Sequence, residues 1–461
     1  MSLFLEKIEK EQNKIVFLTK CVLLVIGLLT AVPYINALYR DIYKVCIVWC
    51  FFLTIYLFVK NRQNFMRKEY IFLLLFCVSY VVTIILRRSH FINEVAMLGY
   101  TGILFFTLTY YDRGRSEKDT KKELKILSWI IIIATFIFSL IGFAMFLFSL
   151  SGYFQLAGQT YVYGMRENRL WGLYNPNTGA VLNYISGIFS LLLIKYEGKK
   201  KKFLVFNLVL QSFCFILTQS RGGWICLLAY VIIYMIYVKK WKKDFRGIRN
   251  WLYRGVLTVL TCLALYGGGE IVKTGLSYAP TGIARIIYSD EEFTKKHNEL
   301  KRLDKKHKNL ESMTTGRFGM WKIGLQAYAE NPVMGIGYRS IDDTLKEMMD
   351  KHSYDNSSAG GLHNVYVTTL VSGGAAGFLL ILGFAVVFLK RGIILFFDKT
   401  TKSYVRYLLI FIPVWLIGEF AESRILFGMN FLAITFWITA GYCMYYTKKE
   451  NMNGKSDRSS V

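Results

Sequence analysis

The stretch GLHNVYVTTLVSGGAAGFLLILGFAVVFL, residues 361–389, decides the fold class. Two polar residues, His363 and Asn364, lie near its start, and no charged residue follows as far as Leu389. A helical bilayer crossing needs about 20 apolar residues, so this run is long enough. Because every backbone N–H and C=O group in lipid must be paired within its own segment, the stretch predicts a membrane-spanning helix with a histidine at its edge.

Similar apolar runs recur along the 461 residues, of which 54% are hydrophobic. They predict an all-α, polytopic membrane protein with twelve spans, the fourth being the weakest because Asn93 and Glu94 lie near its start. The predicted spans are about 15–35, 42–59, 69–86, 91–111, 126–150, 178–195, 203–219, 222–238, 255–272, 362–389, 404–421 and 424–446.

The polar residues divide the chain into four predicted parts. Residues 1–267 hold spans one to nine, and 268–360 form one long loop that carries helices of its own. Residues 361–447 hold spans ten to twelve, and 448–461 form a tail. The eight cysteines all lie in or beside apolar spans without metal-ligand spacing, so we expect neither a metal site nor a disulfide.

The net charge of +26 does not indicate a nucleic-acid-binding protein. The basic residues cluster in alternate loops, among them 113–125, 195–202 and 239–250. This positive-inside distribution predicts both termini in the cytoplasm and the long loop on the outer side of the membrane. The clusters are expected to contact anionic lipid headgroups.

Two helices are predicted inside the long loop. Residues 290–312 suggest a mostly solvated helix, and 315–330 an amphipathic helix capped by Thr315 and ended by Asn331-Pro332. The second repeats Phe318, Trp321, Leu325 and Tyr328 at helical spacing, so we expect this aromatic face to lie on the membrane surface. Ser340 and Asp343 then match a capping box.

Two arginines are candidates for binding phosphate. Arg221 lies in the tight hairpin between the seventh and eighth spans, where a snorkelling arginine is the alternative. Its planar guanidinium suits a phosphate group. Arg317 lies at the start of the amphipathic helix, where a cation is mildly unfavourable unless an anion holds it. A simple surface arginine is the alternative there.

His363 is the candidate base. A lone interfacial histidine is often structural, but a helix N-terminus disfavours a cation, and a neutral imidazole can accept a proton. Further polar candidates could bind sugar or phosphate, although a turn or a structural ion pair explains them as well. These are Arg169, Asn175, Asn177, Arg339, Asn364, Glu419 and Glu422, the last two predicted on one helix face. Gly373, Gly374 and Gly377 are interpreted as close helix packing.

Together these segments resemble the O-antigen ligase and Wzy-type polysaccharide polymerase family. SRGGW at 220–224 is similar to the family's Ser-Arg-Gly segment, and GLYNPN at 172–177 to its Pro-Asn element. GRFGMWKIGLQAYAENPVMGIGY at 316–338 resembles its segment in which an Arg, a Trp, an Asn/His-Pro pair and a Gly-x-Gly follow one another at intervals. HNVYVTTLVSGGAAG at 363–377 fits its His-Asn-x9-Gly-x-x-Gly pattern. The resemblance covers roughly 170–440.

The resemblance implies glycosyl transfer from a polyprenyl diphosphate donor on the outer face of the membrane, with inversion and without a cofactor or metal. It implies His363 as the residue that deprotonates or orients the acceptor hydroxyl, and Arg221 and Arg317 as ligands of the diphosphate. The preferred hypothesis is a polymerase of oligosaccharide repeat units for capsule, exopolysaccharide or O-antigen. A chain-length regulator and a flippase would be its partners. A ligase acting on lipid A core or another acceptor, and a transporter or flippase, remain the alternatives.

Overall fold

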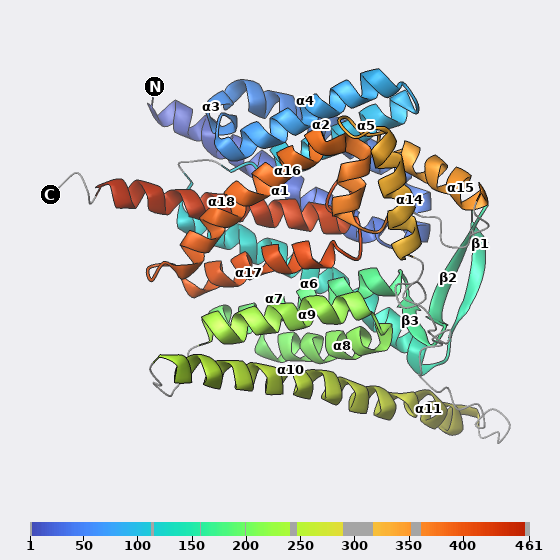
Figure 1. Cartoon of the computed structure of the whole chain (residues 1–461). Coiled ribbons are helices and arrows are strands. Elements are labelled where there is room, and N and C mark those ends of the chain that lie inside the picture. The colour runs from blue at the N-terminus through green and yellow to red at the C-terminus, as the bar shows by residue number, and fades with distance from the viewer. Residues whose placement is uncertain are drawn as a thin grey trace. The chain divides into compact units, whose positions relative to one another are not determined.

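The computed structural model describes residues 2–111, 115–156, 158–198, 200–239, 247–288, 317–351 and 361–456, most of them helical (Figure 1). The chain divides into two units. Unit 1 comprises residues 1–23, 41–116 and 305–461, and unit 2 comprises residues 24–40 and 117–304. The predicted helix at 290–312 and its neighbour Thr315 lie outside the described residues.

Unit 1 brings an early helical segment together with the last third of the chain. Its helix α16 lies along α4 and contacts α14, α17 and α18 (Figure 1). Its elements are α1 (Ser2–Thr30, as far as Leu23), most of α2 (Pro33–Lys60), α3 (Arg62–Phe65), α4 (Lys68–Arg87), α5 (Phe91–Gly102) with the π-helix η1 (Ile103–Leu108), α14 (Arg317–Glu330), α15 (Ser340–Lys351), α16 (Val365–Phe397), α17 (Ser403–Gly418) and α18 (Phe431–Ser456).

Unit 2 is a group of apolar helices with a small sheet. Helices α7 and α8 form its most extensive contact, and α10 packs against α8 and α9 (Figure 1). Its elements are α6 (Glu117–Leu147), β1 (Gly152–Leu156), β2 (Gln159–Arg166), β3 (Arg169–Gly172), α7 (Pro176–Glu197), α8 (Lys201–Thr218), α9 (Arg221–Ile233) with the π-helix η2 (Tyr234–Val238), α10 (Ile248–Ser277) and α11 (Ala279–Tyr288).

The all-α, polytopic fold is confirmed. Within the described part of the chain, nine helices are long and apolar enough to cross a membrane, and Ser403–Gly418 is a shorter apolar helix. The number of twelve spans stays a prediction. The helix predicted at 255–272 continues to Ser277, and α11 follows it directly, so the beginning of the predicted long loop is helical.

The three-stranded antiparallel sheet was not predicted. Strand β1 pairs with β2 in a register that joins Leu156 to Gln159, and β2 pairs with β3. Gly158, at a φ of 75°, lies in the turn between the first two strands. Strand β3 leads into the N-terminus of α7, so the sheet positions the residues that precede this helix.

Helix α14 buries a different face from the aromatic one. Met320, Ile323 and Ala327 pack with Leu362 and Val371 in one core cluster. Of the predicted aromatic face, Phe318 and Leu325 are exposed at 51% and 44%, whereas Tyr328 packs against this cluster. Its contact with a membrane stays a prediction. The helix ends at Glu330, immediately before Asn331-Pro332, as predicted.

The predicted capping box at the start of α15 is not formed. The hydroxyl of Ser340 lies 2.9 Å from the hydroxyl of Ser89, and the Asp343 carboxylate lies 2.6 Å from Nε2 of His90. Both partners lie between α4 and α5, so these side chains make tertiary contacts instead.

The glycines of α16 have two different roles. A Cβ added at Gly377 would lie 3.3 Å from the ring of Phe76 in α4, which agrees with the predicted close packing. Gly374 differs, since its φ of 65° and ψ of −172° interrupt the helix. The predicted membrane-spanning helix is therefore present but interrupted at this one residue.

Candidate functional site

The N-terminus of α16 is built around Asn364. Its side-chain oxygen accepts hydrogen bonds from the backbone N–H groups of Tyr366 at 2.9 Å and Val367 at 3.1 Å, which is an N-cap. His363 therefore lies just outside the helix, in the left-handed region at a φ of 46°. The cap places the imidazole at the end of the apolar helix, as the sequence predicts.

The connection between α17 and α18 folds over this N-terminus. The backbone N–H of Val365 donates to the carbonyl oxygens of Glu419 and Glu422, both at 3.1 Å. The Asn364 amide donates to the carbonyl of Phe420 at 3.2 Å. Helix α17 ends at Gly418, so Glu419 and Glu422 do not share a helix face as predicted. The carbonyls of Glu419, Phe420 and Glu422 thus accept hydrogen bonds from the start of α16.

The carboxylate of Glu422 joins three basic side chains, and we call these four residues the Glu422 cluster. Its Oε2 lies 3.3 Å from Nδ1 of His363. Its Oε1 lies 3.2 Å from Nη2 of Arg317 and 3.0 Å from Nη2 of Arg424. Arg317 also donates from Nη1 to the carbonyl of Ala421. Two predicted site residues, Arg317 and His363, are thus brought together by a third.

The charges of the cluster favour an ionised Glu422. Burial opposes ionisation, but Arg424, the hydrogen bond with His363 and Arg317 outweigh it and lower the pKa of Glu422 to about 2. An ionised carboxylate beside Nδ1 favours the tautomer that carries its proton there. The side chain of His363 is 34% exposed, and its Nε2 makes no hydrogen bond to any residue in the described ranges. That nitrogen is available to accept a proton.

Glu419 is buried next to the Glu422 cluster and binds its main chain. Its exposed fraction is 2%, and its Oε2 accepts the backbone N–H groups of Arg424 at 2.8 Å and Ile425 at 3.4 Å. Glu419 therefore holds the main chain that carries Arg424 through backbone hydrogen bonds.

Arg339 is not part of this cluster. Its backbone N–H donates to Oε1 of Glu94 at 2.7 Å, and its side chain is exposed. In the described chain, none of its hydrogen bonds or ion pairs reaches His363, Arg317 or Glu422.

The remaining candidates lie in unit 2, where Asn177 joins two helix N-termini. Its side-chain oxygen accepts from Nη2 of Arg169 at 2.9 Å and from the hydroxyl of Ser220 at 3.0 Å. Ser220 caps α9 by accepting the N–H of Gly223 at 3.2 Å. Asn175 caps α7 by accepting the N–H of Asn177 at 2.9 Å. The predicted turn thus forms and is also a helix start.

This arrangement places Arg221 at the first position of α9, with an exposed side chain. Arg169 also donates from Nε to the carbonyl of Thr218 at 2.9 Å, which holds the end of α8 next to the start of α9. A Cβ added at Gly223 would lie 2.7 Å from the Cβ of Ala180, so this glycine allows α9 to approach α7. Arg221 therefore extends from a rigid helix end.

Sequence reasoning missed two residues of importance. Arg424 was not among the predicted site residues, and its place in the Glu422 cluster depends on a turn that no local pattern predicts. Glu94 was noted only as a weakness of the fourth span. A carboxylate within an apolar run is a general signal for a functional or structural role, and that signal could have singled it out.

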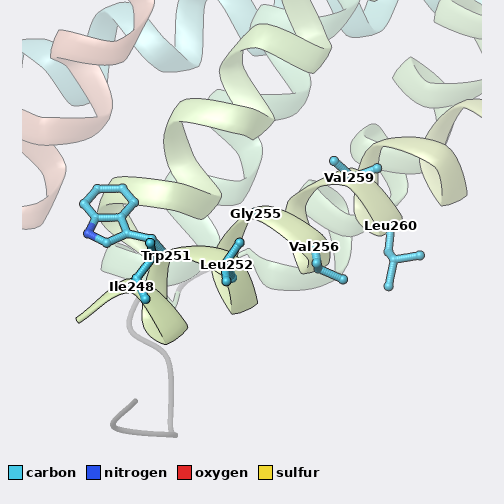
Figure 2. A pocket seen from close by; sticks show the side chains of 7 residues that line it. All are labelled: Ile248, Trp251, Leu252, Gly255, Val256, Val259 and Leu260. Carbon is cyan, nitrogen blue, oxygen red and sulfur yellow. The ribbon is translucent and has the colours of Figure 1, made fainter. Parts of the chain in front are cut away.

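A pocket elsewhere in unit 2 is lined by apolar side chains and the indole of Trp251, and none of its lining residues is charged (Figure 2). It is formed by one face of α10, with Ile248, Trp251, Leu252, Gly255, Val256, Val259 and Leu260. Among the residues that the structure describes, no three His, Cys, Asp or Glu side chains are grouped so that they could hold a metal ion.

Residues 206–382 match the family model described as O-antigen ligase. The match begins within α8 and ends within α16, so it includes Arg221, Arg317 and His363. This finding confirms the family resemblance drawn from the sequence motifs. Comparison with curated proteins found no match.

Proposed function

Because residues 206–382 match the family model described as O-antigen ligase, we propose that this protein transfers a glycan from a polyprenyl diphosphate donor at the outer face of the bacterial cytoplasmic membrane. The observation that carries the proposal is the contact between His363 and the ionised Glu422, with Nε2 of the imidazole left open. A donor with its lipid in the bilayer and its sugar in water has its diphosphate at the interface. A histidine at the end of an apolar helix is suited to react at that level.

His363 would act as the general base in a single displacement. Its Nε2 accepts the proton of the acceptor hydroxyl while the acceptor oxygen bonds to the anomeric carbon. The bond from that carbon to the diphosphate oxygen breaks, and the diphosphate leaves with the electron pair, so the anomeric configuration inverts. Glu422 orients the ring and stabilises the imidazolium that forms, as carboxylates do beside catalytic histidines.

The Glu422 cluster also has the charge to bind the departing diphosphate. Arg317 and Arg424 carry two positive charges, and the ionised Glu422 balances one of them. An arginine has five N–H donors, and Arg317 uses one from each terminal nitrogen on Ala421 and Glu422. Its remaining donors can stabilise negative charge that develops on the leaving group. Arg221 is proposed as a second diphosphate ligand, on the basis of its sequence motif and its exposed position at a helix start.

The preferred acceptor is a second lipid-linked repeat unit, which makes the protein a polymerase. A ligase would use the same donor chemistry and transfer the glycan to lipid A core or another acceptor. The two activities therefore differ in the acceptor alone.

The test uses the purified full chain in lipid nanodiscs with a synthetic polyprenyl diphosphate-linked repeat unit, without nucleotide and with a chelator. Lengthened lipid-linked products, read by mass spectrometry, would support the polymerase. Transfer of the glycan only after lipid A core is added would show that the protein is a ligase instead of a polymerase. In sealed vesicles, movement of the lipid across the bilayer with neither transfer reaction would overturn the proposal in favour of a transporter.

A further inference from the structure

Helix α16 contains a gap that another part of the chain fills. The conformation of Gly374 leaves two carbonyls before it and two N–H groups after it without helical partners. A segment of residues 332–337 supplies all four partners. The N–H groups of Ile336 and Gly337 donate to the carbonyls of Val371 and Ser372, both at 3.0 Å. The N–H groups of Ala375 and Ala376 donate to the carbonyls of Pro332 and Val333, at 2.8 and 3.1 Å.

We call residues 371–376 the socket and residues 332–339 the inserted segment. Irregular backbone in a membrane-spanning helix is tolerated only where protein groups or enclosed water pair with it, and here the inserted segment does so. The fit leaves no room for side chains at the contact. A Cβ added at Gly374 would lie 2.2 Å from the Val333 carbonyl oxygen, and one added at Gly335 would lie 2.5 Å from the Gly374 nitrogen.

The other side of the inserted segment is held by α4 and α5. The Thr83 hydroxyl donates to the carbonyl of Met334 at 2.7 Å, and Nε of Arg87 donates to the carbonyl of Gly335 at 2.8 Å. These contacts fix the segment at two adjacent carbonyls.

Glu94 of α5 completes this attachment. Its Oε1 accepts the N–H of Arg339 at 2.7 Å, and its Oε2 accepts the Tyr80 hydroxyl at 2.6 Å. The Tyr80 oxygen in turn accepts the N–H of Tyr338 at 2.9 Å. Glu94 is only 2% exposed, so its carboxylate is shielded from solvent and makes its hydrogen bonds to these protein groups. A buried carboxylate that binds two consecutive loop residues, one directly and one through a tyrosine, is a specific attachment point.

Helix α14 connects this attachment to the residues of the proposed reaction. This helix ends at Glu330, directly before the inserted segment, and begins with Arg317 in the Glu422 cluster. Its buried face packs on Leu362, which lies just before α16, and on Val371 within α16. The position of Arg317 beside His363 therefore depends on α14 being held at both ends.

We infer that Glu94 is a positioning residue for glycosyl transfer, because it holds the inserted segment in the socket and thereby fixes Arg317 within the Glu422 cluster. The catalytic part of this inference rests on the proposed function, whereas the socket itself does not. A positional error of about 1 Å in a reacting constellation can cost about 100-fold in rate.

The first experiment measures hydrogen exchange of the purified full chain in nanodiscs. In the wild type, the amides of Ile336, Gly337, Ala375 and Ala376 should exchange slowly. Gly374→Ala should accelerate exchange at all four and leave α7 and α8 unchanged. The matched control is Gly373→Ala, since a Cβ there would lie 3.9 Å from Phe76 in an ordinary contact. Equal protection in both variants would overturn the socket.

The second experiment measures turnover of the lipid-linked repeat unit. Glu94→Ala should lower kcat by about 10- to 100-fold with little change in KM, because a displaced Arg317 loses mainly the stabilisation of charge that develops on the leaving group during the reaction. Glu94→Gln keeps an acceptor oxygen for the Arg339 N–H and should restore most of kcat. A rise in KM at unchanged kcat, or no difference between the two variants, would overturn the positioning role.

A folding failure of Glu94→Ala would not obscure the result. Thr83→Val removes one contact to the same segment without uncovering a charge, and the same exchange and kcat changes should follow in weaker form. Glu94→Ala could unfold while Thr83→Val and Glu94→Gln keep normal exchange and normal kcat. That result would show that Glu94 is needed only for folding. If the socket amides of the wild type exchange slowly but the protein transfers no glycan, the proposed function is wrong while the socket is confirmed.

Discussion

Nδ1 of His363 lies 3.3 Å from Oε2 of Glu422, and the other oxygen of this carboxylate is shared by Arg317 and Arg424. One carboxylate thus both orients the proposed base and limits the positive charge around it. Glu422 comes from the turn after α17, Arg317 from α14 and His363 from the start of α16, so three separate segments must fold together before this arrangement exists.

Replacement of Glu422 by glutamine should lower kcat by about 10²–10⁴-fold, the range expected when general base catalysis is lost. The amide keeps the shape but cannot stabilise the imidazolium, and it leaves two arginines without their shared anion. Turnover of the lipid-linked repeat unit measures the effect. Glu330→Gln, an exposed position at the end of α14, is the matched control and should stay at the wild-type rate. Equal rates in both variants would remove Glu422 from the mechanism.

The same substitution predicts a pH-dependent stability difference. The pKa of Glu422 is lowered from 4.5 to about 2, so its ionised form stabilises the fold at pH values above the unfolded pKa. This contribution, roughly 3 kcal/mol at most, is lost as the pH falls from about 4.5 towards 2. Thermal unfolding of the wild type and Glu422→Gln in detergent should differ at neutral pH and converge in acid. A gap that closes already near pH 6 would contradict the ion-pair network.

Arg221→Lys should lose about 10²-fold or more in turnover although the charge is kept, because a planar, forked donor is replaced by a point charge. Arg249→Lys is the matched control, since it is an exposed arginine in the same unit. Near-normal polymer length in Arg221→Lys would reduce Arg221 to a topology determinant.

The sequence predicts the topology as well. Single cysteines introduced into 290–312 of a cysteine-free variant should react with an impermeant maleimide in intact cells. Cysteines at 113–125 and 242–249 should react only after the cells are opened. Reaction of the 242–249 positions from outside would place the proposed site on the wrong face of the membrane.

The helices of this protein could be predicted from sequence because the length of an apolar run is a local property. His363 and Arg317 could be singled out from their places at helix ends. The gap at Gly374 could not be predicted, since its partners lie in residues 332–337 and the glycines suggest packing equally well. The role of Glu422 could not be predicted for a related reason. Helix α17 ends before Glu419, and only the folded turn shows which basic side chains contact Glu422.

Removal of the imidazole should separate catalysis from donor binding. His363→Ala is expected to lower turnover by about 10²–10⁴-fold, because no other open imidazole contacts the Glu422 carboxylate in the described chain. Binding of the donor should persist, since the arginines of the cluster remain. His90→Ala is the matched control, a histidine of the same unit that pairs with Asp343 instead. Cells with His363→Ala should accumulate single repeat units on polyprenyl lipid that faces outward, with little long polymer. Accumulation of these units on the cytoplasmic face would instead indicate a flippase defect, and unchanged polymer length would show that the base is another residue.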